Sequence, residues 1–107
     1  MNPFQPFALA HVDYGKPGQA WRETNLGCSK ESIVREMTSG ELEGVQRVLW
    51  ITATLPPEDI TGEIADALMD EYPDLTESAL EFCEMFGSPL TRRRAFAAID
   101  RRLRAAE

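Results

Sequence analysis

The sequence predicts an α+β domain in which a small, mainly antiparallel sheet of about three strands packs against helices, in the order β-β-α-β-α-α-α. Two apolar stretches flank a glycine and proline turn near the start, and a β-branched, aromatic run follows at Val45–Thr54. Apolar residues then recur at helical spacing through the rest of the chain. Because 107 residues have room for one modest core, we expect a single domain over residues 1–107.

A β-hairpin and a short helix are predicted in the N-terminal part. The stretches PFALAHVDY and QAWRETN flank GKPG, a glycine and proline cluster of the kind that reverses a chain. Ser29 then stands where an N-cap is expected before the helix SIVREMTS, and Gly40 is suited to end it. Ile33, Val34 and Met37 are expected on the buried side of this helix.

The run Val45–Thr54 is the clearest strand, since it lacks breakers until Pro56. Alternation places Val48 and Trp50 on one face, with Leu49 and Ile51 on the other. Apolar side chains on both faces predict a central strand that helices cover on at least one side.

Two acidic helices are expected between Glu58 and Ser88, a segment with ten carboxylates and no basic residue. Pro73 separates them, because its ring disfavours helical geometry in the preceding residue, and Asp74 with Glu77 resembles a capping box. Gly87 is suited to end the second helix. The expected apolar stripes are Ile60, Ile64, Ala67 and Leu68 in the first helix, and Leu75, Ala79, Phe82 and Phe86 in the second.

A last helix is predicted to begin at Ser88-Pro89, because proline at the first helical position loses no hydrogen bond. Its apolar side is expected to be Phe96, Ile99, Leu103 and Ala106. We therefore predict one core in which these larger side chains are mostly buried: Trp50, Ile51, Leu68, Phe82, Phe86 and Ile99.

The residues do not favour catalysis, so we predict that the protein is not an enzyme and uses no cofactor or metal. His11 is the only histidine, and no phosphate-binding, dinucleotide-binding, zinc-protease or nucleophile-elbow motif is present. Cys28 and Cys83 form no C-x-x-C pair, which indicates two free thiols in a reducing compartment. The N-terminus lacks a basic signal region and no apolar run is long enough to cross a bilayer, so a cytoplasmic location with no membrane contact is expected.

Charge is distributed unevenly along the chain. Sixteen acidic and five basic residues up to Ser88 give −11, whereas six basic and two acidic residues from Pro89 onward give +4. The net charge of −7 argues against general nucleic-acid binding, which depends on lysine and arginine.

Three interpretations of this separation stay open. The arginine helix can pair with the acidic helices across an exposed seam, or its arginines can hold DNA phosphates in a regulator. Alternatively, the outward carboxylates form a partner-binding row whose charge density is comparable to that of a nucleic-acid strand. Those carboxylates are Asp59, Glu63, Asp66, Asp70, Glu77, Glu81 and Glu84.

The segment AWRETNLGCSKESIVREMTSGELEGVQRVLWITATLPPEDITGEIADAL resembles a group of small uncharacterised proteins from alphaproteobacterial genomes, plasmids and prophages. The shared features are W-R-E at the end of a hairpin strand, E-S-I-V at a helix start, a glycine, R-V-L, and an acidic helix. The resemblance covers roughly the middle half of the chain. It implies the same order of elements and no activity or ligand.

In size and charge alone, the chain is also similar to the anti-CRISPR proteins of phages. We therefore predict a non-enzymatic inhibitor from a phage or other mobile element, which occupies the basic nucleic-acid-binding surface of a partner protein. The alternative is a house-keeping accessory domain, and a homodimer is left open.

Overall fold

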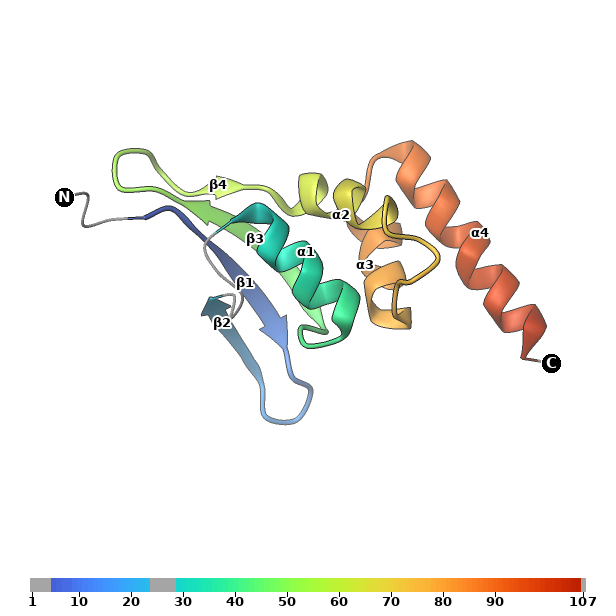
Figure 1. The fold of residues 1–107 in the computed structure, drawn as a ribbon. Coiled ribbons are helices and arrows are strands. Elements are labelled where there is room, and N and C mark those ends of the chain that lie inside the picture. Colours follow the sequence, from blue (N-terminus) through green and yellow to red (C-terminus); the bar gives the residue numbers. More distant parts are fainter. Residues whose placement is uncertain (1–4, 24–28, 107) are drawn as a thin grey trace.

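The computed structural model describes residues 5–23 and 29–106, which form a four-stranded sheet and four helices (Figure 1). The predicted α+β class is confirmed. The elements in chain order are β1 Phe7–Asp13, β2 Gln19–Glu23, α1 Lys30–Ser39, β3 Val45–Ile51, β4 Glu58–Asp59, α2 Thr61–Met69, α3 Glu77–Phe86 and α4 Pro89–Ala105.

The sheet has the order β2-β1-β3-β4, and every neighbouring pair of strands is antiparallel. Four strands replace the expected three or so, because β4 adds a two-residue pairing in which Leu49 lies opposite Asp59. Two acidic residues after a pair of prolines carry no alternating apolar pattern, so this strand has no local signal. The strand predicted to reach Thr54 ends at Ile51.

The hairpin and the first helix form as predicted. The Tyr14 amide donates a hydrogen bond to the Gly18 carbonyl, and this bond closes the turn between β1 and β2. The Ser29 hydroxyl accepts a hydrogen bond from the Ser32 amide at 3.2 Å and so caps α1. Gly40 ends the helix in the left-handed conformation, with a φ of 85°.

Helices cover one face of the sheet. In Figure 1, α1 crosses in front of β1 and β3, while α2, α3 and α4 gather at one end of the molecule, with α4 outermost. The covered face carries the small residues Ala8, Ala10 and Val12 of β1, which are at most 1% exposed and let the helices approach closely. Val48 of the neighbouring strand β3 is also buried, and β3 lies inside the sheet as the prediction of a central strand requires.

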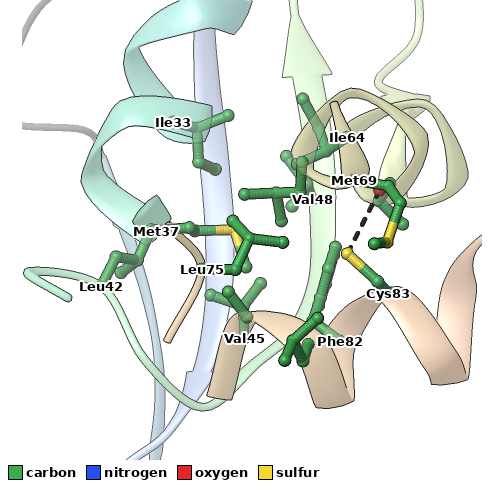
Figure 2. Close-up of a cluster of buried hydrophobic side chains, with 14 of the residues drawn as sticks. Ile33, Met37, Leu42, Val45, Val48, Ile64, Met69, Leu75, Phe82 and Cys83 are labelled. Atoms are coloured by element: carbon green, nitrogen blue, oxygen red, sulfur yellow. Dashed lines mark hydrogen bonds between the residues drawn. The ribbon is translucent and has the colours of Figure 1, made fainter. Parts of the chain in front are cut away.

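The buried side chains form one cluster between the sheet and the helices, and Figure 2 shows part of it. Leu68 and Phe82 are buried as predicted, at 0% and 3% exposure. The other side chains expected in the core are only partly buried and pack against its edge. They are Trp50, Phe86 and Ile99, with Ile51 of intermediate exposure on the opposite face of the sheet.

The prediction for the inward side of the last helix is wrong for Phe96, Leu103 and Ala106, whereas Ile99 packs against the core. Phe96 is 62% exposed and Leu103 is 59% exposed, whereas Thr91, Ala95 and Ala98 are buried. The true inward face begins one residue earlier, which is about 100° around the helix axis. Small side chains at these positions bring α4 close to α3, and the larger apolar residues are left at its flank.

The capping-box prediction at Asp74 is also wrong. The N-cap of α3 is Thr76, whose hydroxyl accepts a hydrogen bond from the Ala79 amide at 3.1 Å. Asp74 belongs instead to the turn after α2, where its amide donates to the Glu71 carbonyl. At the next junction, Ser88 caps α4 and Pro89 occupies its first turn, as predicted.

Candidate functional site

The seven predicted surface carboxylates lie on or next to α2 and α3, but they do not share one environment. Asp59, Glu63 and Asp66 each bind another part of the chain through the carboxylate. The remaining carboxylates have no hydrogen bond or ion pair with residues 5–23 or 29–106. We call these four, Asp70, Glu77, Glu81 and Glu84, the acidic row.

Asp59 holds the start of α2. Its carboxylate accepts hydrogen bonds from the amide and the hydroxyl of Thr61, with 3.0 Å between the amide nitrogen and Oδ1, and it lies 3.7 Å from Arg47 Nε. The Thr61 hydroxyl is the main reason that the pKa of Asp59 is below its usual range. Since the N-cap residue Ile60 provides no side-chain hydrogen bond, the Asp59 carboxylate caps α2 in its place.

Asp66 joins α2 to α4. Its Oδ1 accepts a hydrogen bond from the backbone amide of Ser88 at 2.9 Å, at the point where α4 begins. This amide is the main reason that the pKa of Asp66 is lowered. The negative charge also lies near the positive N-terminal end of α4, which favours the ionised form.

Glu63 bridges α2 to α1 through an ion pair with Lys30, with 3.0 Å between Oε2 and Nζ. The same ammonium lies 5.4 Å from the ring centre of Trp50, above the edge of the core. Both ionic side chains are partly exposed, so the pair contributes little stability.

The acidic row is the part of the predicted surface that stays available. Glu77, Glu81 and Glu84 follow one another at steps of four and three residues on α3, which places them along one side of the helix. Asp70 lies at the C-terminal end of α2 and is exposed. Neighbouring carboxylates that form no ion pair repel one another, so a row of this kind attracts basic groups from outside.

The arginines of α4 do not neutralise that row. Within the described part of the chain, no ion pair joins α4 to α2 or α3, and Arg104 pairs with Asp100 of its own helix at 3.0 Å. Arg102 instead donates to the backbone carbonyls of Pro73 and Leu75, and Arg101 donates to the Tyr72 hydroxyl. The seam of charge pairs considered from the sequence is therefore not formed among these residues.

Two grooves lie beside the acidic row. The first, of about 670 Å³, runs between α1 and α2 over Val34, Ile64 and Ala67, with charged residues at its rim. The second, of about 570 Å³, lies between α3 and α4. It is lined by Glu84, Pro89, Arg92, Arg93 and Phe96.

Cys83 is a buried thiol rather than a nucleophile. It is 0% exposed, and its Sγ donates to the Ala65 carbonyl at 3.3 Å, the contact drawn dashed in Figure 2. Burial, together with the charge of Asp66, raises the pKa of the thiol to about 12. Cys83 is a free thiol, as predicted, and Cys28 lies outside the described residues.

A labelling experiment tests this assignment. In the variant Cys28→Ser, where Cys83 is the remaining thiol, we expect iodoacetamide at pH 8 to modify the folded protein very slowly, because the thiolate is the reacting form. Modification should become fast only when urea unfolds the chain. Rapid labelling without denaturant, or a native disulfide between Cys28 and Cys83 in the unmutated chain, contradicts the assignment.

Two polar features of the structure were missed from the sequence. Glu36 is 0% exposed and lies 4.0 Å from Arg22. Its position between Ile33 and Met37, on the buried stripe of α1, is a signal that could have revealed it. The rings of His11 and Trp21 contact each other across the hairpin at an interplanar angle of 53°, with centres 4.8 Å apart, and this pairing depends on strand register.

Within residues 5–23 and 29–106, no three histidine, cysteine, aspartate or glutamate side chains are grouped so that they could hold a metal ion. No helix in the described part is both long and apolar enough to span a bilayer. Comparisons with protein-family models, curated proteins and solved structures found no match to this chain. The resemblances considered in the sequence analysis therefore stay predictions.

Proposed function

We propose that this protein is a non-enzymatic inhibitor that uses its acidic row to occupy a basic, nucleic-acid-binding surface of a partner protein. The observation that carries the proposal is the series Glu77, Glu81 and Glu84 on α3, with no ion pair to the described part of the chain. The Cβ atoms of neighbours in such a series lie about 5–6 Å apart, which gives a charge density comparable to that of a nucleic-acid strand.

The rigid support of this row favours recognition over a merely solvated surface. α3 packs on α2 and α4, and its inward residues Ala79, Leu80, Phe82 and Cys83 are all at most 3% exposed. The carboxylates are thus held on a fixed helix rather than on a loop, which lowers the entropy lost when a partner binds. A partner that binds phosphates through lysine and arginine meets on the acidic row a series of negative charges that resembles a nucleic-acid backbone.

Asp59, Glu63 and Asp66 belong to the same predicted surface and have roles inside the fold as well. Their intramolecular contacts leave them less free to rearrange toward a partner. We therefore expect reversal of the acidic row to affect binding most, and we choose Asp70, Glu77 and Glu81 for the test because all three are exposed.

The triple variant Asp70→Lys, Glu77→Lys, Glu81→Lys is expected to slow association with a basic partner by about tenfold or more, because long-range attraction governs the encounter. A suitable probe is an RNA-guided DNA nuclease in its guide-free form, whose basic channel normally holds nucleic acid. Surface plasmon resonance at two salt concentrations measures the association rate, and that of the unmutated chain should fall as salt rises.

The matched control is Glu23→Lys, Glu41→Lys, Glu43→Lys, which reverses three exposed carboxylates that do not belong to the acidic row. Both triple variants change the net charge by the same amount, so a difference between them reports position rather than overall charge. Equal association rates for the two variants would show that the acidic row is not the binding surface. Absence of binding by the unmutated chain contradicts inhibition of this class of nuclease.

A further inference from the structure

α3 and α4 pack against each other and present opposite charges beside a shared groove. The α3 edge carries Glu77, Glu81 and Glu84 of the acidic row, and Glu84 reaches the groove. The α4 edge carries Arg92 and Arg93, with Phe96 between the two helices at 62% exposure. Leu103, seven residues after Phe96, continues the same flank of α4 and is 59% exposed.

The charges on the two edges do not satisfy each other within the described part of the chain. Arg92 Nε donates to the Glu84 backbone carbonyl at 3.0 Å, so the Arg92 guanidinium binds the backbone of Glu84 and not its carboxylate. Neither side chain takes part in an ion pair among residues 5–23 and 29–106, and Arg93 does not either. The face therefore combines unpaired charges of both signs with exposed apolar side chains.

We propose that the occupant of this face is a second copy of the same chain. A two-fold arrangement about the groove places α3 of each copy against α4 of the other. The contact between the acidic row of one copy and the arginines of the other therefore occurs twice in the dimer. The exposed Phe96 side chains lie near the centre of such a contact, where they leave water together. An α4-to-α4 contact is disfavoured because it brings arginines of both copies together.

Charge complementarity favours a second copy over an unrelated partner for the whole face. A basic partner matches the α3 edge and repels the α4 edge, whereas an acidic partner does the reverse. A second copy of the chain presents negative charge on α3 and positive charge on α4, so each edge faces the opposite charge. Because the acidic row takes part, self-association and binding to a basic partner exclude one another, although the dimer does not depend on the proposed function.

Sedimentation of the purified full chain, without any partner, tests the dimer. We expect the mass to rise from the 12.0 kDa chain mass to twice that value between micromolar and millimolar concentration. The dissociation constant should increase with salt, because the contact is partly ionic. A chain that stays monomeric at millimolar concentration and low salt overturns the proposal.

Charge variants locate the interface. Arg93→Glu should weaken self-association by about tenfold or more, whereas the control Arg94→Glu, on the side of α4 that faces the end of α2, should leave it unchanged. Glu77→Arg should weaken it similarly, and an equimolar mixture of the Arg93→Glu and Glu77→Arg chains should restore a dimer. Phe96→Ala should also favour the monomer, and circular dichroism checks that each variant is folded.

The outcomes separate this proposal from the proposed function. A dimer that is indifferent to both Arg93→Glu and Phe96→Ala, or that weakens equally with Arg94→Glu, overturns the assignment of this face. Absence of a dimer leaves binding of the nuclease probe by the acidic row unaffected. A dimer that forms as expected, with no binding to the probe, refutes the proposed function alone.

Discussion

Replacing Phe82 by alanine is expected to lower the free energy of unfolding by about 3–5 kcal/mol, the largest effect that we predict for a single side chain. Phe82 is 3% exposed, lies in the buried cluster, and its ring centre is 5.0 Å from that of Phe86. The truncation removes apolar contacts and leaves a cavity that a packed helix cannot fill by relaxing fully. Urea unfolding, followed by far-ultraviolet circular dichroism, measures the change.

Phe96→Ala is the matched control, since it makes the same chemical change on the neighbouring helix at 62% exposure. In dilute protein, where no dimer forms, it should change stability by less than about 0.5 kcal/mol. Similar losses for the two variants would mean that Phe82 does not lie in the core, or that Phe96 is covered in the monomer. A Phe82→Ala loss below about 1.5 kcal/mol also contradicts the packing described.

The elements that the sequence predicted correctly are those with a local cause. Ser29, Gly40 and Ser88 act on hydrogen-bonding groups within a few residues, so their roles as caps follow from the identity of the residue and its neighbours. The hairpin is similar, because the turn at Gly15 to Gly18 needs backbone conformations that glycine adopts readily.

The rotation of α4 could not be predicted in this way. Apolar spacing favours Phe96 and Leu103 as the inward side, but the helix packs through Ala95 and Ala98, since small residues permit the closest approach to α3. That choice depends on the shape of the neighbouring helix, which local spacing does not contain. The exposed Phe96 that results is also the residue that completes the proposed dimer face.

The candidate site was predictable as a set of positions but not as a set of contacts. Helical spacing placed the carboxylates of α3 on one side, and the structure has Glu77, Glu81 and Glu84 there. Asp66 looks equivalent by spacing, yet it binds the amide of a residue 22 positions later. Contacts over such a separation follow from tertiary packing, so the sequence could not distinguish a free carboxylate from one that holds the fold.

Gly44 combines a left-handed backbone with a close backbone contact, so we expect an added methyl group there to be strongly destabilising. Its φ is 71°, and a Cβ atom at this position would lie 2.5 Å from the Asp13 backbone oxygen. The residue is held on both sides: its carbonyl accepts from the Asp13 amide at 2.9 Å, and its amide donates to the Ser78 hydroxyl at 3.2 Å. Through these two hydrogen bonds, Gly44 links the end of β1 to the start of α3.

Gly44→Ala is expected to cost about 3 kcal/mol or more, because the left-handed conformation alone costs a residue with a Cβ roughly 1–2 kcal/mol and the backbone must also move. Gly15→Ala separates the two causes. Gly15 has a φ of 77°, but an added Cβ has nothing within 4 Å, so this variant should lose only the conformational part. Urea midpoints at matched slopes measure both, and equal losses would show that the Asp13 carbonyl yields without cost and that the β1 to α3 contact is not rigid.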